Sequence, residues 1–345
     1  MATTKQETTS QDTAARGAKM MPHQGPNPIR QILNTLREAD AKLIKNHPWL
    51  GQDDAMALGL FAFGVATMLG CGAAWMMGAL PAWLTICGIA LGMSILHEME
   101  HDMIHDLYLS NRATRFMVLI TIWVTKASLD PWTRGRWHLW HHAMSGQEED
   151  IEERLIGLGT PWGLKRILVT LLPAGTIVLK PGLSRAIQRY VARGEQDPQL
   201  LGPPGWWKVH ALTAILASSP FVALGGWLAG ASWAWPMAAL WVLPNMLRHA
   251  TIAIMSSNSH YTGIQKGALM KQGQILDHPF FWPLQFFCWN FGATHFLHHF
   301  FVRQPFWRRT LIFSEVKQKM VVHGIPRNDL QTFARANRRM TTTRA

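Results

Sequence analysis

Histidines recur along this chain in three clusters that could bind metal ions. The chain has 345 residues and 16 histidines, and the clusters read HEMEHDMIH (97–105), HLWHH (138–142) and HFLHH (295–299). Neutral imidazole is the commonest protein ligand of iron, zinc, copper and nickel. One tetrahedral zinc takes at most four ligands, so this number of histidines predicts two metal ions, or one ion surrounded by further histidines. The clustered residues are His97, His101, His105, His138, His141, His142, His295, His298 and His299.

The spacing within each cluster is that of ligands on a helix. His97 and His101 are four residues apart, so on a helix they lie on one face and can hold one ion. His105 continues this row at the same spacing, but each four-residue step shifts the side chain by about 40° around the helix axis. It could bind a metal, hold a water near the metal, or face solvent. The three histidines of HLWHH, or of HFLHH, cannot all lie on one face of a helix. Two of them can share a face and hold one ion, while the third can reach a second ion. Two such motifs facing each other would therefore bridge a metal pair.

Acidic residues lie among and after the histidines. A metal-binding imidazole usually donates its second N–H to a carboxylate or a carbonyl, and these acids are candidates for that role. We expect Asp150, which follows HLWHH, to act in this way, and Glu98 and Asp102 to bind metal or contact its ligands. Glu148 and Glu149 are expected to be solvated. The remaining acids of the set are Glu100, Asp106 and Glu152.

Two long stretches without Lys, Arg, Asp or Glu, residues 55–96 and 209–247, must hold these clusters in place. A helix that crosses a membrane needs about 20 apolar residues, so each stretch is long enough for two spans. Turn residues, Gly78 with Pro81 and Gly230 with Pro236, lie near the middle of each stretch. The sequence therefore predicts an all-α integral membrane protein, with four spans arranged as two hairpins. Their expected limits are about 56–77, 80–97, 209–229 and 232–248; a pair of buried soluble helices is the alternative.

Charge gives the expected orientation. The chain carries 33 Lys and Arg against 21 Asp and Glu, a formal charge of +12, and this excess lies outside the hairpins. The positive-inside rule then places both termini, the central segment and the three histidine clusters in the cytoplasm. The basic residues flank membrane segments and no nucleic-acid motif is present, so anionic lipid headgroups explain them better than nucleic acid. Three cysteines without CxxC spacing provide neither a disulfide framework nor an iron–sulfur site.

The predicted organisation has three parts: a disordered tail (1–28), a membrane domain (29–307) and a cytoplasmic C-terminal segment (308–345). Residues 30–45 have the periodicity of an amphipathic helix, which could lie at the membrane interface or pack on the globular part. Residues 116–125 and 166–183 are apolar but short or broken by proline and glycine. We expect them to be interfacial rather than additional spans.

The order HxxxH, HxxHH, HxxHH around paired hairpins resembles the integral-membrane fatty acid desaturase and hydroxylase superfamily over about residues 55–307. The resemblance implies a four-helix membrane stem beneath a cytoplasmic helical cap that holds a histidine-bound diiron centre. It also implies one more histidine between the second hairpin and the last cluster. His260, in SSNSHYTG, is preferred because it lies further from the membrane than its rival His249 and closer to the third cluster. The ligands implied are His97, His101, His138, His141, His142, His260, His295, His298 and His299, with His105 and His249 left open and no catalytic residue beyond the metal centre.

The chemistry expected of this centre is oxidative. Zinc has no redox chemistry and a hydrolytic zinc site needs three ligands and a water, whereas two irons with O₂ could break an unactivated C–H bond. We expect a C=C bond to form in a fatty acid, a fatty acyl thioester or a lipid. Oxidative decarboxylation to a terminal alkene and hydroxylation are the alternatives within this class. A zinc-dependent membrane hydrolase and a non-catalytic metal-binding or transport protein are the alternatives outside it.

Electrons must come from a separate protein, because the chain has no iron–sulfur, flavin or haem fingerprint. The basic cytoplasmic face would attract an acidic donor such as a ferredoxin, served by its reductase. The expected location is a membrane, the bacterial inner membrane, with the active site on the cytoplasmic side.

Overall fold

A computed structural model describes residues 27–200, 202 and 206–339. The predicted disordered tail (1–28) therefore falls almost entirely outside the described residues. The described part is helical and contains no strand beyond isolated bridges, such as that between His260 and Gly273. The predicted all-α class is confirmed.

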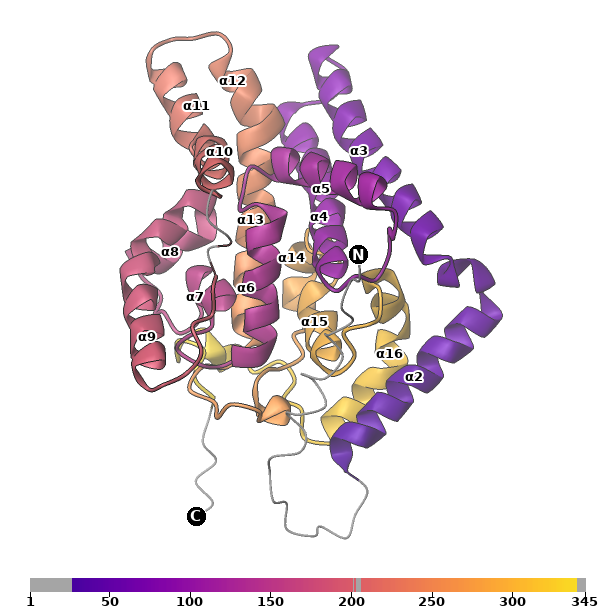
Figure 1. Cartoon of the computed structure of the whole chain (residues 1–345). Helices are drawn as coiled ribbons and strands as arrows, with labels where there is room; N and C mark the ends of the chain where they lie inside the picture. The colour runs from indigo at the N-terminus through magenta and orange to yellow at the C-terminus, as the bar shows by residue number, and fades with distance from the viewer. Residues whose placement is uncertain (1–26, 201, 203–205, 340–345) are drawn as a thin grey trace, which may run out of the picture.

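Three helical segments among the described residues are long and apolar enough to cross a membrane. They are α3 (Asp53–Met76), α4 (Ala82–Ile104) and the joined pair α10 (Trp207–Ala217) and α11 (Ser219–Leu228). The first three predicted spans fall on these segments. In Figure 1, α3 and α11 project from the same end of the molecule, on opposite sides. The chain is thus a membrane protein by its apolar helices.

The fourth predicted span (232–248) takes a different form. It consists of α12 (Ala234–Met237), the π-helical segment η3 (Ala238–Val242) and the start of α13 (Leu243–Ser259), which follow one another without a gap. Pro236 and Pro244 bracket the π-helical segment, and proline disturbs the hydrogen-bond ladder of a helix. This run is not among the segments that meet the membrane-span criteria. The predicted arrangement of four spans as two hairpins stays a prediction.

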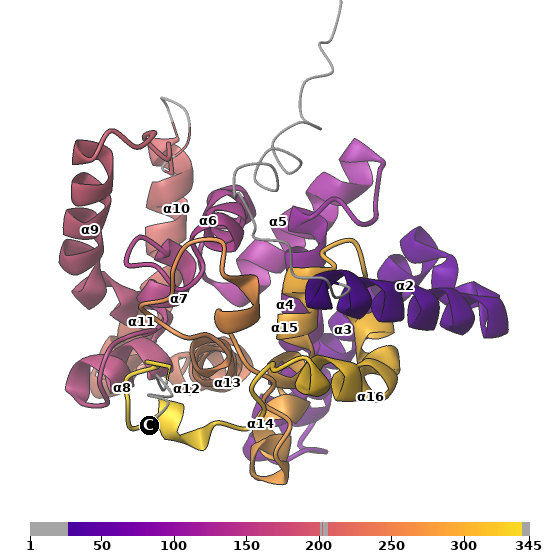
Figure 2. The same cartoon turned by 90° about the horizontal axis from the view of Figure 1, so that it is seen from below.

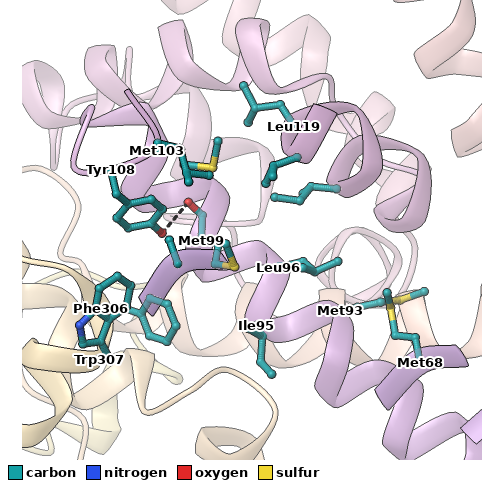
Figure 3. Close-up of a cluster of buried hydrophobic side chains, with 14 of the residues drawn as sticks. Met68, Met93, Ile95, Leu96, Met99, Met103, Tyr108, Leu119, Phe306 and Trp307 are labelled. Atoms are coloured by element: carbon teal, nitrogen blue, oxygen red, sulfur yellow. Dashed lines mark hydrogen bonds between the residues drawn. The ribbon is translucent and has the colours of Figure 1, made fainter. Parts of the chain in front are cut away.

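Helices α3 and α4 pack closely because two glycines meet where they cross. A Cβ atom added at Gly92 would lie 2.7 Å from the carbonyl oxygen of Gly64, so only glycine allows this approach. The turn between the two helices uses Gly78 at a positive φ of 74°. Figure 3 shows the apolar cluster that surrounds the lower part of α4, in which the Tyr108 hydroxyl donates a hydrogen bond to the Met99 carbonyl at 3.1 Å.

A second apolar core lies at the end of the molecule away from the projecting helices. It joins α2 (Pro28–Asn46), α15 (Phe291–Phe300) and α16 (Phe306–Val322), and it includes Ile32, Phe296 and Val316. Figure 2 shows α2 and α16 side by side. Of the two possibilities for the amphipathic helix at residues 30–45, packing on the globular part is the one observed.

The two apolar stretches predicted to be interfacial form short helices. Residues 116–125 lie in α5 (Arg112–Lys126), and residues 166–183 are divided among α8 (Leu164–Leu171), η2 (Pro173–Leu179) and the start of α9 (Lys180–Ala192). Neither stretch is among the membrane-span candidates of the described chain.

Helix α6 (Pro131–Met144), which carries HLWHH, begins after Asp130, whose carboxylate accepts a hydrogen bond from the Thr133 N–H at 2.8 Å. The other helices of the described chain are short: η1 (Pro48–Gly51), α7 (Ile151–Leu155), η4 (Leu269–Lys271), η5 (Pro279–Phe281), α14 (Trp282–Phe286) and η6 (Leu330–Thr332).

Candidate metal centre

Eight histidines form two groups of four that could each hold a metal ion. Within each group the candidate ligand atoms all lie within 4.8 Å of one another. Most of the eight residues are buried; His105 and His299 are partly buried. The first group is His101, His105, His138 and His298; the second is His141, His260, His295 and His299.

Three elements bring each group together. Helices α6 and α15 contribute to both groups, so HLWHH and HFLHH face each other, as predicted for a metal pair. Helix α4 and the residue that follows it add His101 and His105 to the first group. The end of α13 adds His260 to the second group.

The imidazole nitrogens are spaced as ligands of one ion would be. In the first group His105 Nε2 lies 2.9 Å from His138 Nε2 and 3.0 Å from His298 Nε2. In the second group His295 Nε2 lies 2.9 Å from His260 Nε2 and 3.2 Å from His299 Nε2. Two nitrogens about 2.1 Å from one ion and at right angles around it would be ~3.0 Å apart.

Burial favours the neutral form that binds metal. Desolvation lowers the pKa of His105 to about 3 and lowers the pKa values of His138, His260 and His299 well below the usual range. His141 differs: burial is the largest single influence and disfavours its charged form, but the carboxylates of Asp150, Glu153 and Glu152 together outweigh burial and raise the His141 pKa to about 9. His101 Nε2 is buried without any hydrogen-bond partner, which is unfavourable unless a metal occupies its lone pair.

Carboxylates contact two of these rings through Nδ1, the ring nitrogen that points away from the group. His141 Nδ1 lies 2.8 Å from Asp150 Oδ2, and His138 Nδ1 lies 2.5 Å from Glu152 Oε2. Such contacts place the proton on Nδ1 and leave Nε2 free to bind a metal. Asp150 therefore lies where we expected it, behind a histidine of HLWHH. The donor set, eight imidazoles with carboxylates behind two of them, fits a pair of transition-metal ions.

His298 has a different neighbour. Its Nδ1 lies 2.7 Å from Arg309 Nη1, and a guanidinium can only donate. A metal on Nε2 would leave the proton of a neutral ring on Nδ1, facing this donor. A metal on His298 Nε2 would therefore set this proton against the Arg309 guanidinium, whose Nη2 already lies 3.0 Å from Asp102 Oδ1.

His142 lies beside the first group. Its Nε2 is 3.1 Å from His138 Nε2 and 3.2 Å from His298 Nε2, and its ring centroid is 4.6 Å from that of His299, in the second group. It can therefore contribute to either metal.

His97 and His249, in contrast, lie outside both groups. His97 Nε2 is 3.3 Å from Arg134 and its Nδ1 is 3.4 Å from Arg248, so both ring nitrogens face guanidinium groups. His249 Nε2 faces the Val169 carbonyl oxygen at 2.8 Å. The geometry thus brings together eight of the nine predicted ligands, counting His142, adds His105, and leaves out His97. The ligand assignment itself stays a prediction.

The two other acids proposed from the sequence are not in either group. Asp102 Oδ2 accepts a hydrogen bond from the Phe306 N–H at 2.7 Å, and its Oδ1 lies 3.5 Å from His101 Nδ1. Asp102 thus connects a candidate ligand to α16. The Glu98 carboxylate is buried, and its Oε1 has no hydrogen-bond partner.

Sequence reasoning missed the buried cations around the centre. Lys126 and Arg134 both contact the Glu100 carboxylate, Arg134 at 2.6 Å, and Arg248 lies nearby on α13. Arg248 could have been found, because it directly follows the charge-free stretch 209–247, where a charged side chain usually has a function. No signal in the sequence pointed to Arg309.

A cavity of about 600 Å³ opens beside the metal-binding groups. His101, His138 and His295 line it, and Ala217, Ser218 and Phe221 of the apolar segment α10–α11 line it as well. Its volume lies in the range of small-molecule sites. The cavity therefore connects the candidate metal centre to a helix able to face lipid.

Comparison with known proteins agrees with this geometry. A search among curated proteins found no match. The sequence does match the family described as Fatty acid desaturase over residues 73–331, which is well over half of the chain and includes all three histidine clusters. On this match, and with two groups of buried histidines beside apolar helices, the chain belongs to the fatty acid desaturase family.

Proposed function

We propose that this protein is an O₂-dependent, non-haem diiron oxidoreductase that acts on a fatty acyl chain and forms a C=C bond. The observation that carries the proposal is the pair of four-histidine groups beside a cavity that extends to α10–α11. Iron bound by these imidazoles would supply the oxidising power that a C–H bond of an alkyl chain requires.

The protein's own residues have three roles in this proposal. The eight grouped histidines hold the metals, and Asp150 and Glu152 fix the rings of His141 and His138. Apolar side chains of α10–α11 and of neighbouring helices bind the acyl chain and exclude water from the cavity. Substrate position within the cavity decides which carbon meets the oxidant. The same site would serve decarboxylation or hydroxylation if the position differed.

An external electron donor is part of the proposal. No cysteine cluster suited to an iron–sulfur centre is found among the described residues, whose three cysteines are free. A ferredoxin-type protein with its reductase would supply the electrons at the basic cytoplasmic face.

The experiment is a reconstituted assay with the purified chain, a medium- or long-chain acyl substrate, iron, O₂ and a ferredoxin–reductase system. Products are separated by gas chromatography and identified by mass spectrometry. We expect turnover only when all components are present, and a product with a new C=C bond. Turnover without O₂, or with zinc as the only metal, would instead indicate the hydrolase class. A hydroxylated product or a terminal alkene would identify one of the other oxidative reactions.

Orientation in the membrane is tested separately. In a variant without native cysteines, single cysteines at Gly78 and at Gly230 should react with a membrane-impermeant maleimide added outside intact cells. A cysteine at the exposed position Gln188 should react only after lysis. Labelling of Gln188 from outside would place the histidine groups on the opposite face and would contradict the cytoplasmic donor.

A further inference from the structure

Arg248 has an unsatisfied binding edge in the wall of the cavity. It lies in α13 with only 3% of its surface exposed, and it lines the cavity. Its Nη1 contacts His97 Nδ1 at 3.4 Å, while its Nε and Nη2 are buried without hydrogen-bond partners. Nε and Nη2 form one side of the planar guanidinium, the side that binds a carboxylate through two parallel hydrogen bonds.

The charges around Arg248 do not provide a partner. Lys126 and Arg134 share Glu100, and Arg134 also contacts Glu152 at 3.4 Å. Within the part of the chain that the structure describes, Arg248 forms no ion pair. A buried, unpaired guanidinium is costly, and charged groups near membrane depth usually mark a ligand site.

His97 cannot satisfy the surrounding arginines. A neutral imidazole has one donor and one acceptor nitrogen, and guanidinium groups of Arg134 and Arg248 face its two nitrogens. It can therefore accept from only one of them. One of the two guanidinium groups is therefore left without an acceptor on His97.

We infer that Arg248 binds the carboxylate of a free fatty acid, with the acyl chain lying in the cavity beside the metal centre. This inference rests on the proposed function and deepens it, since it selects the free acid over an ester or thioester. One unpaired guanidinium balances one negative charge, which favours a carboxylate over a phosphate dianion. The apolar lining supplied by Leu129, Ile156, Ala217, Phe221 and Ile252 suits the hydrocarbon part of such a molecule.

The test is equilibrium binding to the full-length protein in phosphatidylcholine nanodiscs, at mildly alkaline pH and with empty discs subtracted. The probes are radiolabelled dodecanoate, methyl dodecanoate and dodecyl phosphate. The wild type should bind dodecanoate roughly 10- to 100-fold more tightly than the methyl ester, because charge-assisted hydrogen bonds are lost in the ester. Arg248→Gln should abolish this preference and leave binding of the ester unchanged.

Two further variants make the test specific. Arg185→Gln changes an exposed arginine of α9, away from the cavity lining, and should behave like the wild type. Arg248→Lys keeps the charge but cannot donate two parallel hydrogen bonds to one carboxylate, so the preference for dodecanoate should fall several-fold. This variant carries the test if Arg248→Gln does not fold. An unchanged preference in the variants, equal binding of acid and ester by the wild type, or tighter binding of dodecyl phosphate would each overturn the inference.

The binding assay needs no iron, O₂ or electron donor, so its outcome is independent of turnover. Preferential binding of dodecanoate without oxidation would contradict the proposed function alone. Oxidation of the methyl ester, in a wild type that shows no preference for the acid, would contradict only the role of Arg248.

Discussion

At the scale of single residues, the end of α4 decides which histidines can reach a metal. Helix α4 ends at Ile104, and His105 adopts the C-cap conformation with φ −90° and ψ 11°. Leaving the helix there brings its ring to His138 and His298. His97, two turns earlier, remains on the helix and faces two arginines.

Two alanine variants distinguish these positions. His105→Ala should lower bound iron to roughly half, because the first group loses one of its four ligands. His97→Ala should keep nearly the full iron content, since His97 lies outside both groups. Iron per chain is measured by plasma mass spectrometry on purified protein. Normal iron in His105→Ala together with loss of iron in His97→Ala would show that α4 holds the metal through the other end of the histidine row.

Asp150→Asn tests the carboxylate behind His141. Asparagine can still cap α7, where the Asp150 side chain accepts from the Glu153 N–H, but it removes the charge beside His141 Nδ1. Metal affinity should fall about 10- to 100-fold, measured by competition with a chelator. Glu148→Gln, which changes an exposed acid paired with Arg189, is the matched control and should have no effect. Equal metal affinities in the two variants would show that Asp150 acts only as the cap of α7.

The sequence predicted most of the histidines that lie together, because ligands must be particular residue types at helical spacing. It also predicted that the Asp150 carboxylate contacts a histidine of HLWHH. Arg248 stood out in the sequence as the charge that ends an uncharged stretch, but its place in the cavity wall could not be predicted, and nor could Arg309, because both depend on how α13 and α16 pack against α4. Nor could periodicity show that α4 ends between His101 and His105.

At the scale of the helices, the crossing of α3 and α4 determines where the histidine row lies. Gly64 and Gly92 let the backbones approach, and the apolar cluster of Figure 3 surrounds the end of α4 that carries the histidines. The spans of this pair were predictable because charge-free runs of this length are diagnostic. The π-helical segment before α13 was not, since it reflects local backbone adjustment between two prolines.

Gly92→Ala should lower the thermal midpoint of unfolding in detergent. The new Cβ would meet the Gly64 carbonyl oxygen and Met68 Cγ, both at 2.7 Å, and overpacking of this kind costs about 1–3 kcal/mol. Gly59→Ala makes the same chemical change on α3, where nothing lies within 4 Å, and should be neutral or slightly stabilising. If both variants had the same midpoint, the close crossing would not contribute to stability.

At the scale of the whole molecule, the cavity links two environments that differ in polarity. Its histidine-lined part belongs to the packed helical core, whereas its other wall is α10–α11, most of whose side chains are not buried inside the protein. Phe221, which lines the cavity, is itself 58% exposed. Under the proposed function, a hydrocarbon chain would pass between bilayer and cavity along this wall without crossing water.

If the proposed function holds, this wall of α10–α11 has a kinetic consequence, because it would make the lipid bilayer the solvent from which the protein draws its substrate. The reaction rate should follow the mole fraction of fatty acid in the membrane rather than its concentration in the whole sample. Adding inert phosphatidylcholine to proteoliposomes at fixed amounts of enzyme and fatty acid should lower a subsaturated rate roughly in proportion to the dilution. Initial rates over a series of lipid-to-substrate ratios provide the measurement. A rate that ignores this dilution and depends only on bulk concentration would mean that the substrate arrives from water, through an opening on the other side of the molecule.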